Sequence, residues 1–293
     1  MDVQITQMNG QSIKLSDINV QVQDFRVSSI ETRPNYIDVD GSNGRIYTGA
    51  TYGVRTITVP FYFKAQDLLD VTMLRDRLFE VITNVEPFYI RELRRLEYQN
   101  GENQFIGGKR YKVMLSSTFD IEQTFKYGFG ELTFETTDLP FAESIGKSSD
   151  IQRYGVDATS GLWGIGMGII SDDASHIYQH NVVPGQQFKI YNPGNLPVHP
   201  FEQELKITIS DVIGSTYGFK LKNLTNFSTA TINVPLSSKD IVIYSGPDVG
   251  RSGLAFLRNT DKDFIELVPG WNTFEVFNCT SATVYFDFRF YYK

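Results

Sequence analysis

The sequence has little of the chemistry on which enzymes and metal sites depend. Its 293 residues include one cysteine, Cys279, and three histidines. A lone cysteine cannot form a disulfide within its own chain, so the fold must depend on packing. Any Ser-His-Asp or Cys-His centre would have to use His176, His180 or His199. The sequence therefore gives no support for a catalytic centre, and we expect a protein that is not an enzyme.

Positive charge and long apolar runs are also scarce. The chain has 27 Lys and Arg against 34 Asp and Glu, a formal net charge of −7. Tight wrapping of nucleic acid needs clustered basic side chains, and that pattern is missing. No apolar stretch approaches the roughly 20 residues of a membrane-spanning helix. The start, Met1 to Gln4, has no basic and then apolar pattern of a signal peptide. We expect a protein made in the cytoplasm, with no membrane partner.

Aromatic residues are what the sequence has in excess. There are 22 Phe and 16 Tyr but only 2 Trp. Phe and Tyr favour the half-buried surfaces of sheets, and the length is typical of two domains. We predict a mainly β protein of two domains: an N-terminal domain over 1–145, a linker or extended loop rich in Gly, Ser and Asp over 146–185, and a C-terminal domain over 186–293.

The first half shows one clear strand and one clear helix. Ile57, Val59, Phe61 and Phe63 share one parity, which is typical of a strand with a buried face. Because Pro60 cannot donate a ladder hydrogen bond, this strand is predicted to lie at a sheet edge or to carry a local irregularity. The helix is predicted from Asp67, its N-cap, to about Asn84. Its apolar stripe recurs every three or four residues, at Val71, Leu74, Leu78 and Val81.

The second half is predicted to be almost entirely β. Apolar and polar residues alternate over 205–210, 219–222 and 284–291, with turn signals about every eight to twelve residues. This spacing indicates a sandwich or jelly roll. The regular ladder of Val284, Phe286, Phe288 and Phe290 must pack against another sheet.

Three short motifs suggest ligands but do not fit them. The glycines of Trp163 to Gly168 lack the spacing of a dinucleotide loop and the helix that should follow it. His176 and His180 could bind zinc on a helix, but their context favours a β hairpin carrying surface histidines. The Asp38 to Gly44 segment does not fill the ligand register of a calcium loop, and its residues also favour plain turns. No cofactor and no metal are predicted.

Several segments together resemble the distal tail protein (Dit) family of siphophages that infect Gram-positive bacteria. The order and spacing of these segments extend over nearly the whole chain, although 145–185 matches little. The segments are Arg55 to Phe63 running into Asp67 and Leu74 to Phe79, then Lys109 to Val113, Phe129 to Phe134, Asp138 to Ser144, Ile190 to Asn195, Gly270 to Asn272, and Phe286 to Tyr292.

The resemblance implies a structural subunit of the virion at the tail tip. The N-terminal domain would be a β-sandwich or split barrel with one helix and an extended hairpin. Six copies would close into a ring, possible also as back-to-back rings, and the C-terminal domain would be a galectin-like sandwich. The ring would join the major tail-tube protein to the tail-associated hub or lysin protein, and its channel would pass the tape measure and DNA. Candidate residues of the interface between subunits are Ile57, Val59, Phe61, Phe63, Arg75 and Arg77.

Two other functions compete with this one. The C-terminal domain could be a carbohydrate-binding module that contributes to adsorption on the host cell wall, with Trp163 and Trp271 as candidates for stacking on sugar rings. The sugar-binding patterns of true galectins are absent. The second rival is an enzyme such as a cell-wall hydrolase, given where tail tips act. Paired carboxylates such as Asp172-Asp173 lie in polar loops, where carboxylates are usually solvated, and sequence cannot show the facing pair that glycoside hydrolysis needs.

Overall fold

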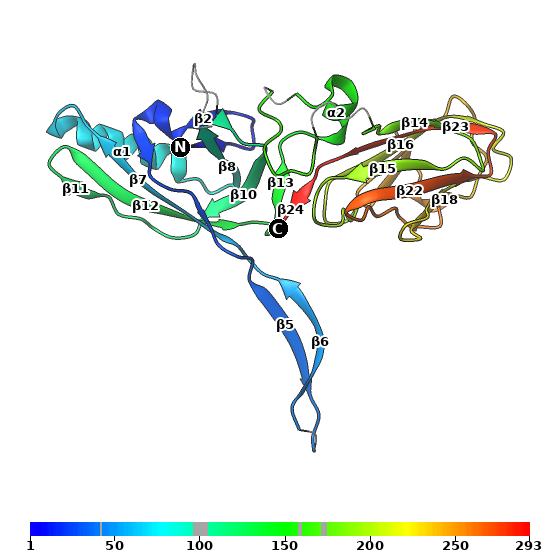
Figure 1. Cartoon of the computed structure of the whole chain (residues 1–293), viewed down its shortest axis with the longest axis horizontal. Helices are drawn as coiled ribbons and strands as arrows, with labels where there is room; N and C mark the ends of the chain where they lie inside the picture. The colour runs from blue at the N-terminus through cyan, green and yellow to red at the C-terminus, as the bar shows by residue number, and fades with distance from the viewer. Residues whose placement is uncertain (42, 96–104, 158–159, 171–174) are drawn as a thin grey trace. The chain divides into compact units, whose positions relative to one another are not determined.

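A computed structural model describes residues 1–41, 43–95, 105–157, 160–170 and 175–293 (Figure 1). The chain forms two compact units, Met1–Ala142 together with Lys293, and Glu143–Tyr292. Both are built mainly from strands, as predicted. Within the described residues, no helix has the length and apolar character that crossing a bilayer requires.

The first unit is one curled antiparallel sheet. Its strands follow the order β2-β1-β8-β10-β12-β7-β3, with β4 also paired to β7, β9 to β8 and β11 to β12. A single apolar core lies against this sheet. The strands are β1 (Asp2–Thr6), β2 (Ser12–Lys14), β3 (Val20–Val22), β4 (Arg26–Val27), β7 (Thr56–Lys64), β8 (Phe88–Arg95), β9 (Phe105–Ile106), β10 (Lys109–Leu115), β11 (Glu122–Thr124) and β12 (Tyr127–Thr136), and a 3-10 turn, η1, spans Leu15–Ile18.

The predicted helix is confirmed as α1 (Leu68–Ile82). The Asp67 carboxylate caps it by accepting hydrogen bonds from the backbone N–H groups of Leu69 and Asp70, each at 2.9 Å. These bonds satisfy two amides that have no partner inside the helix. The side chains that α1 buries recur every three or four residues and pack into the core of the first unit: Val71, Leu74, Leu78 and Ile82.

Strand β7 carries an irregularity and is not an edge strand. It pairs with β12 on one side and with β3 and then β4 on the other. Between Val22, opposite Phe61, and Arg26, opposite Thr58, the partner chain has one residue more than β7. Pro60 lies at this break, where its carbonyl accepts from the N–H of Gln23 at 2.9 Å. The second of the two predicted alternatives for Pro60 is therefore confirmed, and the edge-strand alternative is wrong.

A two-stranded hairpin of β5 (Thr32–Asp38) and β6 (Arg45–Tyr52) interrupts the chain between β4 and β7. Figure 1 shows it reaching away from the sheet of its own unit. Every residue of β5 is exposed, and so is every residue of β6 except Gly49. Among the described strands, β5 and β6 pair only with each other.

The second unit is a sandwich of two antiparallel sheets. One has the order β14-β23-β16-β19-β20-β21 and the other β15-β22-β17-β18. Rings from both sheets meet between them, with the centroids of Phe274 and Phe286 5.0 Å apart. The strands are β14 (Gln179–Val182), β15 (Phe188–Asn192), β16 (Leu205–Ile213), β17 (Phe219–Asn223), β18 (Thr229–Ile232), β19 (Val242–Ser245), β20 (Asp248–Arg251), β21 (Leu254–Ala255), β22 (Gly270–Phe277) and β23 (Ser281–Phe288), with η2 at Leu257–Asn259. Two short strands, β13 (Ala142–Ser144) and β24 (Tyr291–Tyr292), pair with each other outside these two sheets.

The predicted linker over 146–185 is corrected, because this segment is folded into the second unit. It contains α2 (Ser148–Tyr154) and strand β14. The Ser148 hydroxyl is fully buried and bonds both the carbonyl of Phe286 and the N–H of Phe288. Trp163 and Met167 are also buried. Residues 158–159 and 171–174 of the predicted linker lie outside the described residues.

Candidate functional site: an exposed hairpin and its surroundings

The β5–β6 hairpin presents apolar side chains to solvent. Tyr36, Ile37, Ile46 and Tyr47 are 49–60% exposed. The two tyrosine rings pack edge to face with centroids 6.0 Å apart. Arg45 lies over the Tyr36 ring at 5.9 Å and also pairs with Asp38 at 3.6 Å. A surface this apolar outside any core is typical of a contact with another molecule.

A bulge shapes the hairpin in its middle. The register shifts between Asn35, which faces Gly49, and Tyr36, which faces Tyr47, so Thr48 is the extra residue. Its hydroxyl donates to the carbonyl of Asn35 at 3.2 Å. Gly49 has a φ of +136°, a conformation that L side chains rarely adopt. A β-bulge increases the local twist of the two strands, and bulges are common at the edges of sheets.

Four of the six predicted interface residues belong to the core instead. Ile57, Val59, Phe61 and Phe63 are each 0% exposed. They occupy the inner face of a strand that is paired on both sides, so their side chains are already covered by the unit itself. The alternation that predicted them was a correct signal of burial, and this part of the interface prediction is corrected.

Arg75 and Arg77 lie on the exposed side of α1. The guanidinium of Arg75 contacts the carboxylate of Asp76 at 3.2 Å. Arg77 continues a helical row that starts with Leu69 and Met73, which are 83% and 70% exposed. Residues four apart on a helix are surface neighbours. The row therefore forms a mixed apolar and basic ridge, and both arginines stay candidates for a contact between proteins.

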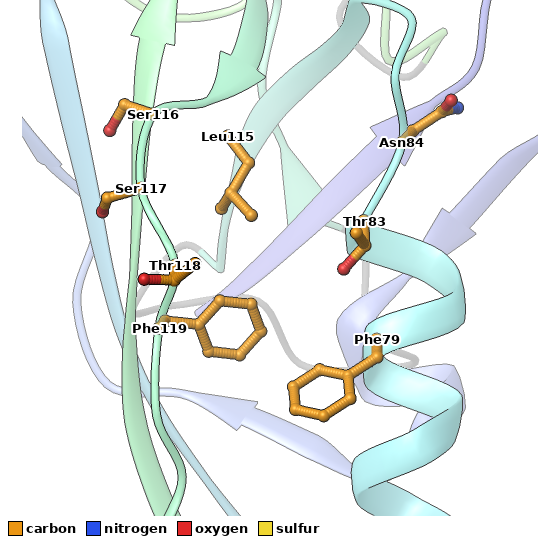
Figure 2. A pocket seen from close by; sticks show the side chains of 8 residues that line it. All are labelled: Phe79, Thr83, Asn84, Leu115, Ser116, Ser117, Thr118 and Phe119. Atoms are coloured by element: carbon orange, nitrogen blue, oxygen red, sulfur yellow. The ribbon is translucent and has the colours of Figure 1, made fainter.

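A hollow of about 630 Å³ lies beside the end of α1 in the first unit. Figure 2 shows Phe79 of α1 and Phe119 facing each other in it, with ring centroids 5.4 Å apart. None of the lining side chains is ionisable. The hollow therefore contains no general acid, and no general base that could activate one of its hydroxyl groups as a nucleophile. The lining residues are Phe79, Thr83, Asn84, Leu115, Ser116, Ser117, Thr118 and Phe119.

The two tryptophans differ sharply in exposure. Trp163 is 4% exposed and stacks on Phe290 with ring centroids 5.9 Å apart. Its prediction as a sugar-stacking residue is corrected, because a ring covered by the core cannot contact a saccharide. Trp271 is 41% exposed. It lies on β22 with its ring 4.8 Å from that of Tyr191 on the neighbouring strand β15.

The other ligand motifs do not assemble into sites. His180 lies on β14, while His176 is 7% exposed and stacks on Tyr191, so the prediction of a surface position is wrong for His176. The Asp38 to Gly44 motif forms the far end of the hairpin, with residue 42 outside the described residues. In the described part of the chain, no group of three or more His, Cys, Asp or Glu is arranged to hold a metal ion.

A family model described as the phage tail protein RIFT-related domain matches residues 9–136, which covers most of the first unit. The match shows a phage tail protein domain in the first unit of the chain. This domain supports a structural role in a phage tail or baseplate, and hence a virion-associated protein. The resemblance to distal tail proteins that the sequence segments predicted is confirmed at the level of family and fold.

Solved structures extend the likeness to the second unit. The Dit protein of phage SPP1, described as a paradigm of the hub adsorption apparatus in phages that infect Gram-positive bacteria, matches with a TM-score of 0.63 at 11% identity, covering 98% of this chain and 99% of that one. Two structures of the phage P2 baseplate in its activated conformation, with Ca and with Sr, give TM-scores of 0.40 and 0.39, both at 8% identity, and cover 99% and 98% of this chain and 97% of each matched chain. No curated protein matches the chain.

Proposed function

We propose that this phage tail protein is a distal tail subunit, six copies of which close into a ring at the tail tip. The observation that carries the proposal is the exposed β5–β6 hairpin. Ordering a hairpin without a buried face is unfavourable for an isolated molecule. A neighbouring subunit that covers its apolar side chains would supply the missing burial.

Ring closure follows from the kind of contact that the hairpin can make. The hairpin and the Leu69–Met73–Arg77 ridge are different surfaces of one subunit, so a contact between a hairpin and another region of the next copy is head to tail. Such a contact generates a ring when its rotation closes. Back-to-back pairing of two rings would then use a second surface.

The ring would join the tail tube to the tail-tip hub. Its proposed partners are further copies of the chain, the major tail-tube protein and the tail-associated hub or lysin protein. Its channel would pass the tape measure and then DNA. The net charge of −7 suits a conduit along which an anionic polymer must slide. Assembly is proposed to take place in the host cytoplasm.

The work of the chain is proposed to be structural and not catalytic. The phage tail domain over residues 9–136 supports this view. Incubation of the purified protein with peptidoglycan tests it. We expect no soluble fragments, and their release would contradict the proposal.

A shortened hairpin tests the ring. Thr32 lies opposite Tyr52, so residues 33–51 can be replaced by Asn-Gly, a pair suited to a two-residue hairpin turn. We expect the variant to keep the melting temperature of the parent, because the deleted residues bury nothing in the core. Light scattering and negative-stain images should show sixfold rings for the parent and monomers for the variant.

Tyr217→Ala serves as the matched control, since Tyr217 is 88% exposed in the other unit. It should assemble like the parent. Equal masses for the parent and the shortened variant would contradict the role of the hairpin.

A further inference from the structure

The outer face of the four-stranded sheet in the second unit carries an aromatic platform. Trp271 and Tyr191 are directly paired in the register of β22 and β15 and therefore point to the same face. Their ring centroids are 4.8 Å apart, with the planes inclined at 45°. Trp271 is the more exposed of the two residues, at 41%. An exposed tryptophan offers a broad apolar face together with an N–H donor.

Neighbouring groups hold the platform in place, and one of them, His176, packs on the Tyr191 side with its ring 6.0 Å from that of Trp271. The Tyr191 hydroxyl donates to the carbonyl of Gly168 at 3.2 Å, and the ring of His176 stacks parallel to it at 4.7 Å with an angle of 3°. Next to Trp271, the buried Asn272 accepts hydrogen bonds from the Val268 N–H at 2.9 Å and from the Asn223 side chain at 3.0 Å. Side chains that are already ordered lose little entropy when a ligand binds.

Polar groups flank the platform on the same face. Lys189 and Thr273 form the next register pair along β15 and β22. Directly opposed side chains on a sheet lie about 4.5–5.5 Å apart at Cβ, so Lys189 and Thr273 lie close to the Trp271 ring. Lys189 is exposed. The nearest acid in this register, Glu275, lies one pair further along and opposite Lys222.

We propose that this platform binds a saccharide that carries an acidic group. The apolar face of a pyranose ring stacks on the Trp271 indole, the Thr273 hydroxyl bonds a ring hydroxyl, and the Lys189 ammonium pairs with a phosphate or carboxylate on the sugar. A hydrophobic protein contact fits less well, because the next register pair on this face of the two strands is polar, Thr273 and Lys189. The inference does not depend on the ring proposed above.

The test uses the full chain on an array of hexose and N-acetylhexosamine oligosaccharides, each in a neutral, a uronate and a phosphate-bearing form, with calorimetry on the strongest binders. We expect binding in the micromolar to millimolar range, at least fivefold tighter for acidic than for neutral forms. Trp271→Ala should weaken it at least tenfold. Lys189→Ala should lower the affinity for acidic forms at least fivefold, which removes their advantage over neutral forms.

Tyr217→Ala, which removes an exposed ring elsewhere in the same unit, should bind like the parent. The melting temperature and the mass of the assembly of each variant report folding and ring formation separately from sugar binding. The proposal is overturned if the parent binds no member of the array at millimolar concentration, if Trp271→Ala binds as tightly as the parent, or if neutral and acidic forms bind equally.

Discussion

Two glycines on β12 leave room for two large aromatic rings in the core of the first unit. On β12, Gly128 lies opposite Phe63 and Gly130 opposite Phe61. A Cβ atom at these glycines would come within 2.3 Å and 2.7 Å of the facing rings. The rings therefore lie across the glycine backbone, and each Phe–Gly pair needs both members. In the sequence, the run Phe129-Gly130 therefore indicates this packing as well as a strand.

Replacement of Phe61 by alanine tests its assignment to the core. Because the ring is fully buried, we expect Phe61→Ala to lower the free energy of unfolding by about 3–5 kcal/mol, measured by urea denaturation of the monomer. Phe125→Ala is the control, since Phe125 is 69% exposed, and it should change stability by less than about 0.5 kcal/mol. If Phe61→Ala left the stability of the monomer unchanged but abolished assembly, Phe61 would be an interface residue and not a core residue.

At the scale of elements, ionic contacts fasten the start of the second unit. Arg289 is 14% exposed; its Nε lies 2.9 Å from Glu204 and 3.9 Å from Glu143. Its Nη1 donates to the carbonyls of Ser144 and Ile145 at 2.9 and 2.6 Å. The Lys147 ammonium contacts the other oxygen of Glu204. These bonds attach β13 and the beginning of α2 to the sandwich.

This network predicts an acid-sensitive contribution to stability. Burial by itself raises the pKa of Glu204, but the hydrogen bond from Lys147 and the charge of Arg289 lower it below its ordinary value near 4.5. A lowered folded-state pKa means that the stabilisation is complete above about pH 4.5 and is lost as the pH falls through the folded pKa. Glu204→Gln lacks this contribution.

Urea midpoints of the parent and Glu204→Gln should therefore differ at pH 6–7 and converge as the pH falls toward 3. The comparison removes the effect of the other carboxylates, which both proteins share. A difference that is constant over this range would show that the charge of Glu204 contributes nothing.

Elements with one buried face could be predicted from their residue pattern, whereas the exposed hairpin was predicted only from the resemblance to distal tail proteins. The stripe on α1 and the alternation in β7, β16 and β23 reflect burial on one side. The hairpin strands β5 and β6 bury neither face, so no alternation marks them. Helix α2 has seven residues, too few for a stripe, and Lys147 in the N-cap position is not a typical cap.

The candidate sites follow the same division. The sequence pattern showed which apolar residues share a face. It could not show that the apolar residues from Ile57 to Phe63 are buried inside their own unit, or that Trp271 is exposed to solvent. Trp163 lies in a Gly-rich segment whose composition is typical of a linker, so the sequence did not predict its burial. Only the fold shows that its ring is stacked on Phe290.

At the scale of the whole molecule, the boundary between units can be tested by truncation. A fragment of residues 143–293 retains Ser148, Trp163 and Tyr178, which contact the last strands of the sandwich. A fragment of residues 186–293 lacks them and also leaves the β23 edge without β14. We expect the longer fragment to unfold cooperatively on heating and the shorter one to be unfolded or aggregated, as followed by circular dichroism and light scattering. Two equally stable fragments would place the boundary near residue 186.

The solvent exposure of β5 and β6 also has a consequence for how the chain can change over evolutionary time. Substitutions there cost the monomer almost nothing in folding free energy, so selection acts on them only through whatever they touch. Positions whose residues covary with those of the hairpin across relatives would then identify the surface that the hairpin contacts. If the hairpin residues varied without such covariation, the hairpin would have no conserved contact surface.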